Sequence, residues 1–431
     1  MLKALVNAFR VPDLRNKILF TLLMIILYRV GSFIPVPGIP YSALVESFET
    51  AAGSAAWGSM ALLNLFSGGA LSYVSVFSLG IMPYITAQII MQLMQGVIPS
   101  LQRLAKTGEA GQNKITQYTR YLTLVLALIN AIGYLLLFQS AEFNIVFSGA
   151  VVPVWMTDII IVVTLIAGTA LIMWMGELIT QRGVGNGMSL IIFANVVSRF
   201  PSAIFSSFQL EGTNGLAITI LIIVCVLAVI PAIVFIEGGQ RRIPINYAKR
   251  VVGRRVMGGT STYLPLKVNA AGVIPIIFAS ALLYFPVQIA AFFPDVHWLT
   301  VTANALSSGW INWLCNFFLI VLFAYFYTSM VFNPQDTADM LRKQGGFVPG
   351  VRPGTATATY IHNVLLRITL PGAVFVAAIA VVPSIIFQFT GNTLIQAFGG
   401  TSILIMVGVA LDTMNKLESQ LKMHHYEGFF K

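Results

Sequence analysis

Residues 73–96 have the sequence YVSVFSLGIMPYITAQIIMQLMQG, an apolar run that contains no Asp, Glu, Lys or Arg. About 20 apolar residues suffice for a helix to cross the roughly 30 Å hydrocarbon core of a membrane. Gly80 and Pro83 interrupt the run, and irregular backbone at membrane depth is tolerated where protein buries it or where it lines a cavity. The segment therefore predicts a membrane span that borders a pathway.

The motif around Gly80 recurs about half a chain later. Residues 80–85 read GIMPYI and residues 272–277 read GVIPII, while a second pattern occurs as GMSLII at 187–192 and as GTSILI at 400–405. Corresponding Gly- or Pro-interrupted segments in two halves of a membrane protein point to a pathway between structural repeats. Duplication explains these matches, although two short matches in a chain rich in Gly and Ile can also arise by chance.

Composition places the chain in the membrane. Of its 431 residues, 57% are hydrophobic and 9% are charged, whereas about 25% are charged in a typical soluble domain. Helices are expected, because a helix satisfies its own backbone hydrogen bonds in lipid. Ten apolar windows are predicted spans: 18–36, 73–96, 121–139, 154–176, 186–208, 216–236, 268–292, 310–332, 368–389 and 401–420.

We therefore expect an all-α polytopic membrane protein with ten transmembrane helices. Dividing the chain into residues 1–212 and 213–431 gives five predicted spans in each half. An odd number of spans per half inserts the second half upside down, so the two pseudo-symmetric halves are expected to be inverted repeats.

The positions of Lys and Arg predict the orientation, since short loops rich in these residues stay in the cytoplasm. With both termini cytoplasmic, only Arg29 and Arg199 of the 25 basic residues lie at or beyond the outer ends. The net charge of +10 is thus mostly a topology signal. Two cytoplasmic loops, 237–267 and 333–367, are long and basic, and they predict a docking surface for an acidic or polyanionic partner.

Several chemistries find no support in the sequence. Cys225 and Cys315 fall in apolar spans, and the His residues form no H-E-x-x-H pattern, so we expect no metal site, no cofactor and no enzyme activity. Span interiors are almost free of acidic and basic residues, and Glu177 and Asp412 lie near span ends, which disfavours a proton- or ion-coupled transporter. A small-solute transporter with inverted repeats and an intramembrane enzyme remain alternative function classes.

Two features predict a gated apolar pathway. The isoleucines that end the four repeated motifs are Ile85, Ile192, Ile277 and Ile405, and such side chains form a constriction that excludes ions by dewetting; ordinary packing between helices is the alternative. Residues 61–70, ALLNLFSGGA, are apolar but too short to cross a membrane. They predict a re-entrant half-helix or, alternatively, an amphipathic helix on the membrane surface.

Several longer motifs resemble the SecY family, the pore subunits of bacterial Sec protein translocases. They are FIPVPG at 33–38, GIMPYI at 80–85, GVGNG at 183–187, PLKVN at 265–269, GFVPGVRPG at 346–354 and GGTS at 399–402. The resemblance implies a passive channel in the bacterial cytoplasmic membrane that passes unfolded secretory polypeptides and releases transmembrane segments sideways into lipid. It implies SecE and SecG as small membrane partners, and SecA, the ribosome or the proton motive force as the driver.

The resemblance also implies roles for individual residues. The pore ring would consist of Ile81, Ile85, Met188, Ile192, Ile277 and Ile405. The plug, about residues 61–72, would include Leu65, Phe66, Ser67, Gly68 and Gly69. The lateral gate between the second and seventh spans would include Thr86, Gln92, Asn269 and Ser280. The surface for SecA or the ribosome would include Arg241, Arg242, Arg254, Arg255 and Arg352.

Some residues depart from the family pattern. Met188 stands where the ring usually has a branched aliphatic residue, and its flexible thioether is expected to soften the seal. Gln88 occupies a position on the gate helix that is usually small, and Thr355 and Ala356 follow Arg352 where charged residues are common. These departures bear on gating and partner affinity.

Overall fold

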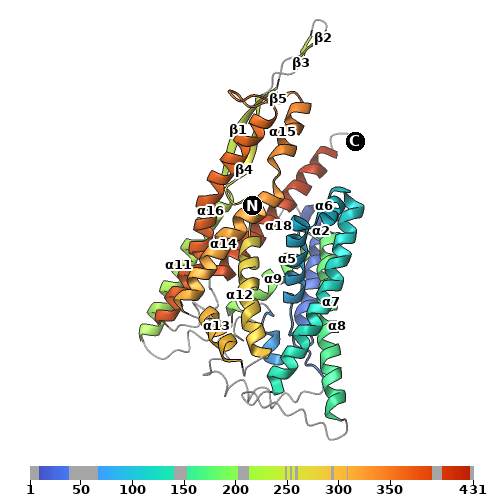
Figure 1. The fold of residues 1–431 in the computed structure, drawn as a ribbon, viewed down its shortest axis with the longest axis vertical. Helices are drawn as coiled ribbons and strands as arrows, with labels where there is room; N and C mark the ends of the chain where they lie inside the picture. The colour runs from blue at the N-terminus through green and yellow to red at the C-terminus, as the bar shows by residue number, and fades with distance from the viewer. Residues whose placement is uncertain are drawn as a thin grey trace.

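The chain is mostly helical in a computed structural model (Figure 1). The structure describes residues 9–37, 67–139, 153–201, 213–247, 250–252, 255–257, 261–292, 296–307, 309–390 and 400–427. The helices are α2 (Pro12–Gly31), α5 (Met82–Val97), α6 (Pro99–Lys106), α7 (Glu109–Gln139), α8 (Val154–Arg182), α9 (Gly187–Val197), α11 (Thr213–Glu237), α12 (Ile274–Phe292), α13 (His297–Ser307), α14 (Trp310–Val331), α15 (Pro334–Lys343), α16 (Thr355–Thr390) and α18 (Gly400–Glu427).

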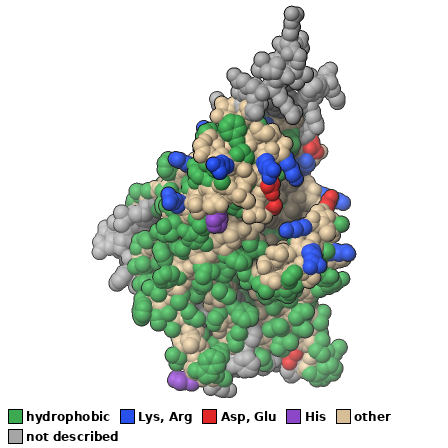
Figure 2. All heavy atoms as spheres, turned by 45° about the horizontal axis from the view of Figure 1, so that its top comes forward, with side chains coloured by type: hydrophobic (Ala, Val, Ile, Leu, Met, Phe, Trp, Pro, Cys, Tyr) green, Lys and Arg blue, Asp and Glu red, His purple; other side chains and the backbone are tan. Residues whose placement is uncertain are grey.

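Four segments of the described chain are both long and apolar enough to cross a membrane: Glu109–Leu136, Trp155–Arg182, Trp310–Lys343 and Thr355–Ile386. Each of the ten predicted windows overlaps one helix, but the count of ten spans stays a prediction. Figure 2 shows apolar side chains over the body of the molecule and Lys and Arg gathered toward one end. Large side chains such as Leu23, Val163 and Phe318 are more than half exposed on this body, as expected for a surface that faces lipid.

Helices from the two halves of the chain lie side by side (Figure 1). Across this boundary α5 contacts α12, and α9 contacts α18. These are the pairs of helices that begin with the matched sequence motifs. The repeated motifs therefore meet where the halves meet.

The motifs shorten two helices relative to the prediction. In the window 73–96, where Gly80 and Pro83 were expected to interrupt the span, α5 begins only at Met82, after a 3-10 turn η1 (Ala70–Tyr73) and further turns. The window 268–292 becomes helical only at Ile274. Gly80 and Gly272 have φ values of 58° and 61°, and a proline follows at the helix start in both cases, where its missing N–H costs nothing.

Gly187 and Gly400, the first residues of α9 and α18, let backbones approach closely. A Cβ atom at Gly187 would collide with the carbonyl oxygen of Gly176 in α8, and one at Gly400 with the carbonyl oxygen of Ile379 in α16. The second pair of motifs thus fixes each helix start against the preceding helix.

The loops 237–267 and 333–367 contain strands that the all-α prediction did not include, so that prediction holds only as "mostly helical". Strand β1 (Gln240–Tyr247) pairs antiparallel with β4 (Ser261–Lys267) and with β5 (Gly346–Phe347), and β2 (Arg250–Val252) pairs with β3 (Arg255–Met257). Alternation of buried Ile243 and Ile245 with exposed neighbours puts one face of β1 on a small core that includes Leu341 and Ile361. This core packs the sheet on α15 and α16.

Candidate pore and lateral gate

The six predicted ring residues come together in the main hydrophobic core. Ile81, Ile85, Met188, Ile192, Ile277 and Ile405 are each at most 8% exposed and belong to one cluster of packed side chains. All six lie within the first six residues of four helices, or at the N-cap in the case of Ile81: α5, α9, α12 and α18. Four helix N-termini thus converge on this apolar cluster.

The start of α9 shows how a ring segment is positioned. The Asn186 side chain caps the helix by accepting a hydrogen bond from the backbone N–H of Met188 at 3.1 Å. The backbone N–H of Gly187 donates to Thr180 Oγ1 at 2.9 Å. A Cβ at Gly176 would collide with the Met188 sulfur, so this thioether lies directly against α8.

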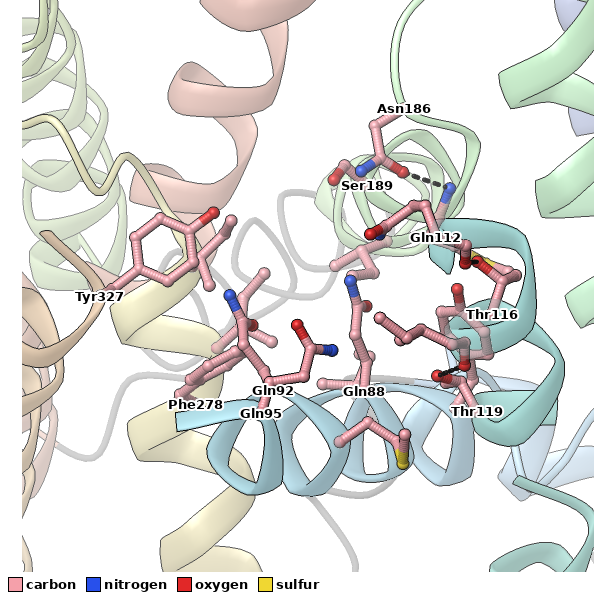
Figure 3. Close-up of a pocket in the computed structure, with 18 residues that line it drawn as sticks. Gln88, Gln92, Gln95, Gln112, Thr116, Thr119, Asn186, Ser189, Phe278 and Tyr327 are labelled. Carbon is pink, nitrogen blue, oxygen red and sulfur yellow. Dashed lines mark hydrogen bonds between the residues drawn. The ribbon is translucent and has the colours of Figure 1, made fainter. Parts of the chain in front are cut away.

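A cavity of about 210 Å³ adjoins the cluster (Figure 3). Four ring residues line it: Ile85, Met188, Ile192 and Ile277. Ile81 and Ile405 pack in the same cluster without lining this cavity. The structure therefore brings all six residues together but divides them between the cavity wall and the packed core beside it.

Most residues of the remaining cavity wall are polar, and none is charged. No Asp, Glu, Lys, Arg or His is among its 18 lining residues. Gln88, Gln92 and Gln95 reach it from α5, and Figure 3 shows Gln112, Thr116 and Thr119 on the adjacent helix α7. The sequence analysis singled out Gln88 and Gln92 but missed this stripe, although spacings of four and three residues put the glutamines on one helix face.

The four predicted lateral-gate residues have different surroundings. Helices α5 and α12 contact each other, and Gln92 lines the cavity between them. The Thr86 hydroxyl forms a hydrogen bond within its own helix, donating to the carbonyl of Met82 at 3.0 Å. Asn269 precedes α12 and donates to the carbonyl of Gly272 at 3.1 Å, while Ser280 is half-buried on α12.

Asn269 also lies at the base of the β1–β4 hairpin. Its side-chain nitrogen is 3.5 Å from Glu237 Oε1 at the end of α11, and the backbone N–H of Val268 donates to the carbonyl of Gly239 at 2.9 Å. These contacts close the hairpin where α11 ends and where the chain leads into α12.

Of the predicted plug residues, Ser67, Gly68 and Gly69 are described, and Leu65 and Phe66 lie outside the described residues. Ser67 is 2% exposed, and the following η1 buries Ala70 and Leu71 in the main core. The described part of the segment is thus packed inside the protein. That packing disfavours a surface helix for these residues.

The predicted docking arginines lie on or beside the sheet. Arg241 and Arg242 are exposed on β1, and the Arg242 guanidinium carbon lies 4.8 Å from the centre of the Tyr263 ring on β4. Arg352 is exposed shortly after β5. Arg255 begins β3, and Arg254 lies outside the described residues.

Comparison with known proteins gives consistent matches. The SecY family model matches residues 75–414. The chain is 47% identical to protein translocase subunit SecY of Streptomyces coelicolor over 453 residues, which cover 100% of both chains. It is 46% identical to protein translocase subunit SecY of Mycobacterium tuberculosis over 448 residues, again with 100% coverage of both.

Solved structures share the fold at lower sequence identity. The structure described as "The structure of a protein conducting channel" is similar with a TM-score of 0.62 and 18% identity, covering 94% of this chain and 91% of that one. "Sec61 in the Canine ribosome-channel complex from the endoplasmic reticulum" is similar with a TM-score of 0.58 and 17% identity, with the same two coverages. With its apolar helices and these full-length matches, the chain is a multi-pass membrane protein that belongs to the SecY family.

Proposed function

We propose that the chain is the channel subunit of a Sec-type translocase in a bacterial cytoplasmic membrane, with both termini in the cytoplasm. It passes unfolded polypeptides and releases transmembrane segments into lipid. The observation that carries the proposal is the burial of all six predicted ring residues in the main hydrophobic core, near the N-terminal ends of four helices where the two halves of the chain meet. Residues 1–212 and 213–431 then act as two inverted halves around this pore ring.

The pore ring suits a seal that must open for many different chains. Apolar side chains exclude ions by dewetting and offer a passing polypeptide no strong polar contact. The N-terminus of a helix carries a partial positive charge of roughly half an elementary charge. Four such termini beside the ring add an electrostatic barrier against cations.

The neutral cavity suits an unfolded substrate. A glutamine side chain both donates and accepts hydrogen bonds, so the stripe formed by Gln88, Gln92 and Gln95 can satisfy peptide groups whatever the sequence of the substrate. Because the lining carries no formal charge, it neither retains nor repels a particular charged side chain. Thr86, Gln92, Asn269 and Ser280 would belong to the lateral gate between α5 and α12.

Energy and partners come from outside the chain in this proposal. SecA or the ribosome would dock on the exposed Arg241 and Arg242 of the sheet and on Arg352, which follows β5. Arg254 and Arg255 would belong to the same docking surface. The proton motive force would assist, and SecE and SecG would complete the complex. One structural neighbour is described as Sec61 in a ribosome–channel complex, which supports the ribosome as a partner.

Reconstitution tests the proposal. Vesicles that contain the chain with SecE and SecG should import an unfolded preprotein when SecA and ATP are supplied. Vesicles that lack the chain are the control. Copurification of two small membrane proteins with the tagged chain is also expected, and a chain that neither binds such partners nor supports import would contradict the proposal.

A small-solute transporter is the second candidate, because the neutral cavity of about 210 Å³ has room for a small zwitterionic molecule. Its test is thermal stabilisation of the purified chain by amino acids or similar solutes. Stabilisation together with failed preprotein import would favour this candidate.

A further inference from the structure

We propose that Arg29 is a positioning residue that holds the plug-like segment, here residues 67–73, in its packed position between α2 and α9. We call this packed position the seat. This inference rests on the proposed function, because it assigns a gating role to that segment. Arg29 lies near the end of α2, and its Nη1 donates a hydrogen bond to the backbone carbonyl of Gly68 at 2.9 Å. A cation that binds a peptide carbonyl makes a charge-assisted hydrogen bond, which is stronger than a bond between neutral groups.

The arginine is itself held in place. Its guanidinium carbon lies 5.4 Å from the centre of the Phe33 ring. This cation–π geometry restricts the orientation of the guanidinium group. Arg29 is also one of only two basic residues at the outer ends of the predicted spans. A bond to the plug-like segment gives this exception to the positive-inside rule a structural reason.

The other side of the seat is formed by α9. Gly68 has a φ of +67°, and a Cβ built on it would lie 2.5 Å from Asn195 Oδ1 and 3.1 Å from Arg29 Nη1. Asn195 is completely buried. The backbone at Gly68 therefore fits between α2 and α9 only because it carries no side chain.

A second attachment lies further along the same segment. The backbone N–H of Val36 donates to the carbonyl of Val74 at 3.0 Å, and that of Val76 donates to the carbonyl of Ile34 at 2.9 Å. The Tyr28 and Phe77 rings stack with their centroids 5.4 Å apart. Breaking the bond between Arg29 and Gly68 would leave these contacts intact, so residues 74–77 stay anchored while residues 67–73 lose one of their attachments. The carbonyl of Ala70 still accepts from the backbone N–H of Ser75 at 3.1 Å and from the Ser78 hydroxyl at 3.1 Å.

The test measures whether the segment stays seated. Ala70 is 1% exposed, so a cysteine introduced by Ala70→Cys should be protected from a membrane-impermeant maleimide in resting proteoliposomes. Chains without Ala70→Cys measure the labelling of the native cysteines. With Arg29→Met added, we expect labelling to become about tenfold faster, the order of effect of losing one hydrogen bond to a charged group. Resting ion leak should rise in parallel, whereas import driven by SecA should persist.

Two further variants keep the test decisive. Arg29→Lys retains the charge but lacks the planar fork, so an intermediate labelling rate is expected. Gly68→Ala leaves every charge in place and should release the segment by clashing with Asn195. If Arg29→Met does not fold, Gly68→Ala alone tests the seat. Arg103→Met, which removes an exposed positive charge on α6, is the control and should leave the labelling rate unchanged.

The outcomes separate the inference from the proposed function. Unchanged labelling and leak in both Arg29→Met and Gly68→Ala would overturn the role of Arg29, even if the parent chain imports preprotein normally. A parent chain that imports no preprotein would instead overturn the proposed function.

Discussion

Replacing Ile405 by asparagine should make the closed pore leak ions. Ile405 is 2% exposed and lies in the same buried core as the other five pore-ring residues. Full burial of such a side chain stabilises the packed state by about 1.5–3 kcal/mol. An amide without partners in the same place costs a further ~1–3 kcal/mol.

The two costs together weaken the packed ring by about 2.5–6 kcal/mol, and each 1.4 kcal/mol changes a population roughly tenfold. We expect the resting leak to rise by about two orders of magnitude or more. The assay is dye-reported proton flux in vesicles that contain the chain with SecE and SecG but no SecA. Ile405→Leu, which keeps the apolar volume, is the matched control and should seal like the parent. Equal flux in Ile405→Asn, Ile405→Leu and parent vesicles would refute the reasoning, because the ring would then not be the seal.

Three further changes test other parts of the structure. Arg352→Glu should slow SecA-driven import by about tenfold or more by reversing an exposed docking charge, without changing resting leak; equal import rates would remove Arg352 from the docking surface. Gly187→Ala should destabilise the fold by about 1–3 kcal/mol through overpacking against Gly176. Gly96→Ala is the control and should not destabilise it, because the added atom would meet nothing nearer than 4.0 Å. Thermal unfolding in detergent compares the two variants. Glu177→Gln breaks an ion pair in which Arg120 donates two hydrogen bonds, at 2.6 and 2.7 Å. It should lower the free energy of unfolding by about 1 kcal/mol in the same assay, because Arg120 is partly exposed. Asp412→Asn, which removes an exposed pair with Lys416, should lower it by less.

Hydropathy and the repeated motifs predicted the parts of the fold that depend on local pattern. Long apolar windows became helices because the backbone has no alternative partner in lipid. The matched isoleucines Ile85, Ile192, Ile277 and Ile405 all reached one buried cluster. These isoleucines could be predicted because they occupy equivalent positions in repeated motifs of the two halves. A single isoleucine in an apolar span could not be distinguished from ordinary helix packing.

Other features depended on contacts that the sequence does not display. The strand β1 was missed because it contains Arg241, Arg242 and, in its middle, Pro244, and a proline argues against a strand. Its pairing with β5 joins residues about a hundred positions apart. The glutamine stripe is a property of one face of α5, which Gln88, Gln92 and Gln95 share, and no single glutamine in the sequence indicates it.

The closed base of the β1–β4 hairpin has a mechanical consequence. Because Val268 bonds to Gly239 and Asn269 approaches Glu237, the two strands are tied together at their root and bend as one stiff arm. Only six residues separate Lys267, the end of β4, from Ile274, the start of α12. A load applied far out on the arm therefore acts with leverage, and it becomes a torque on the first turn of α12.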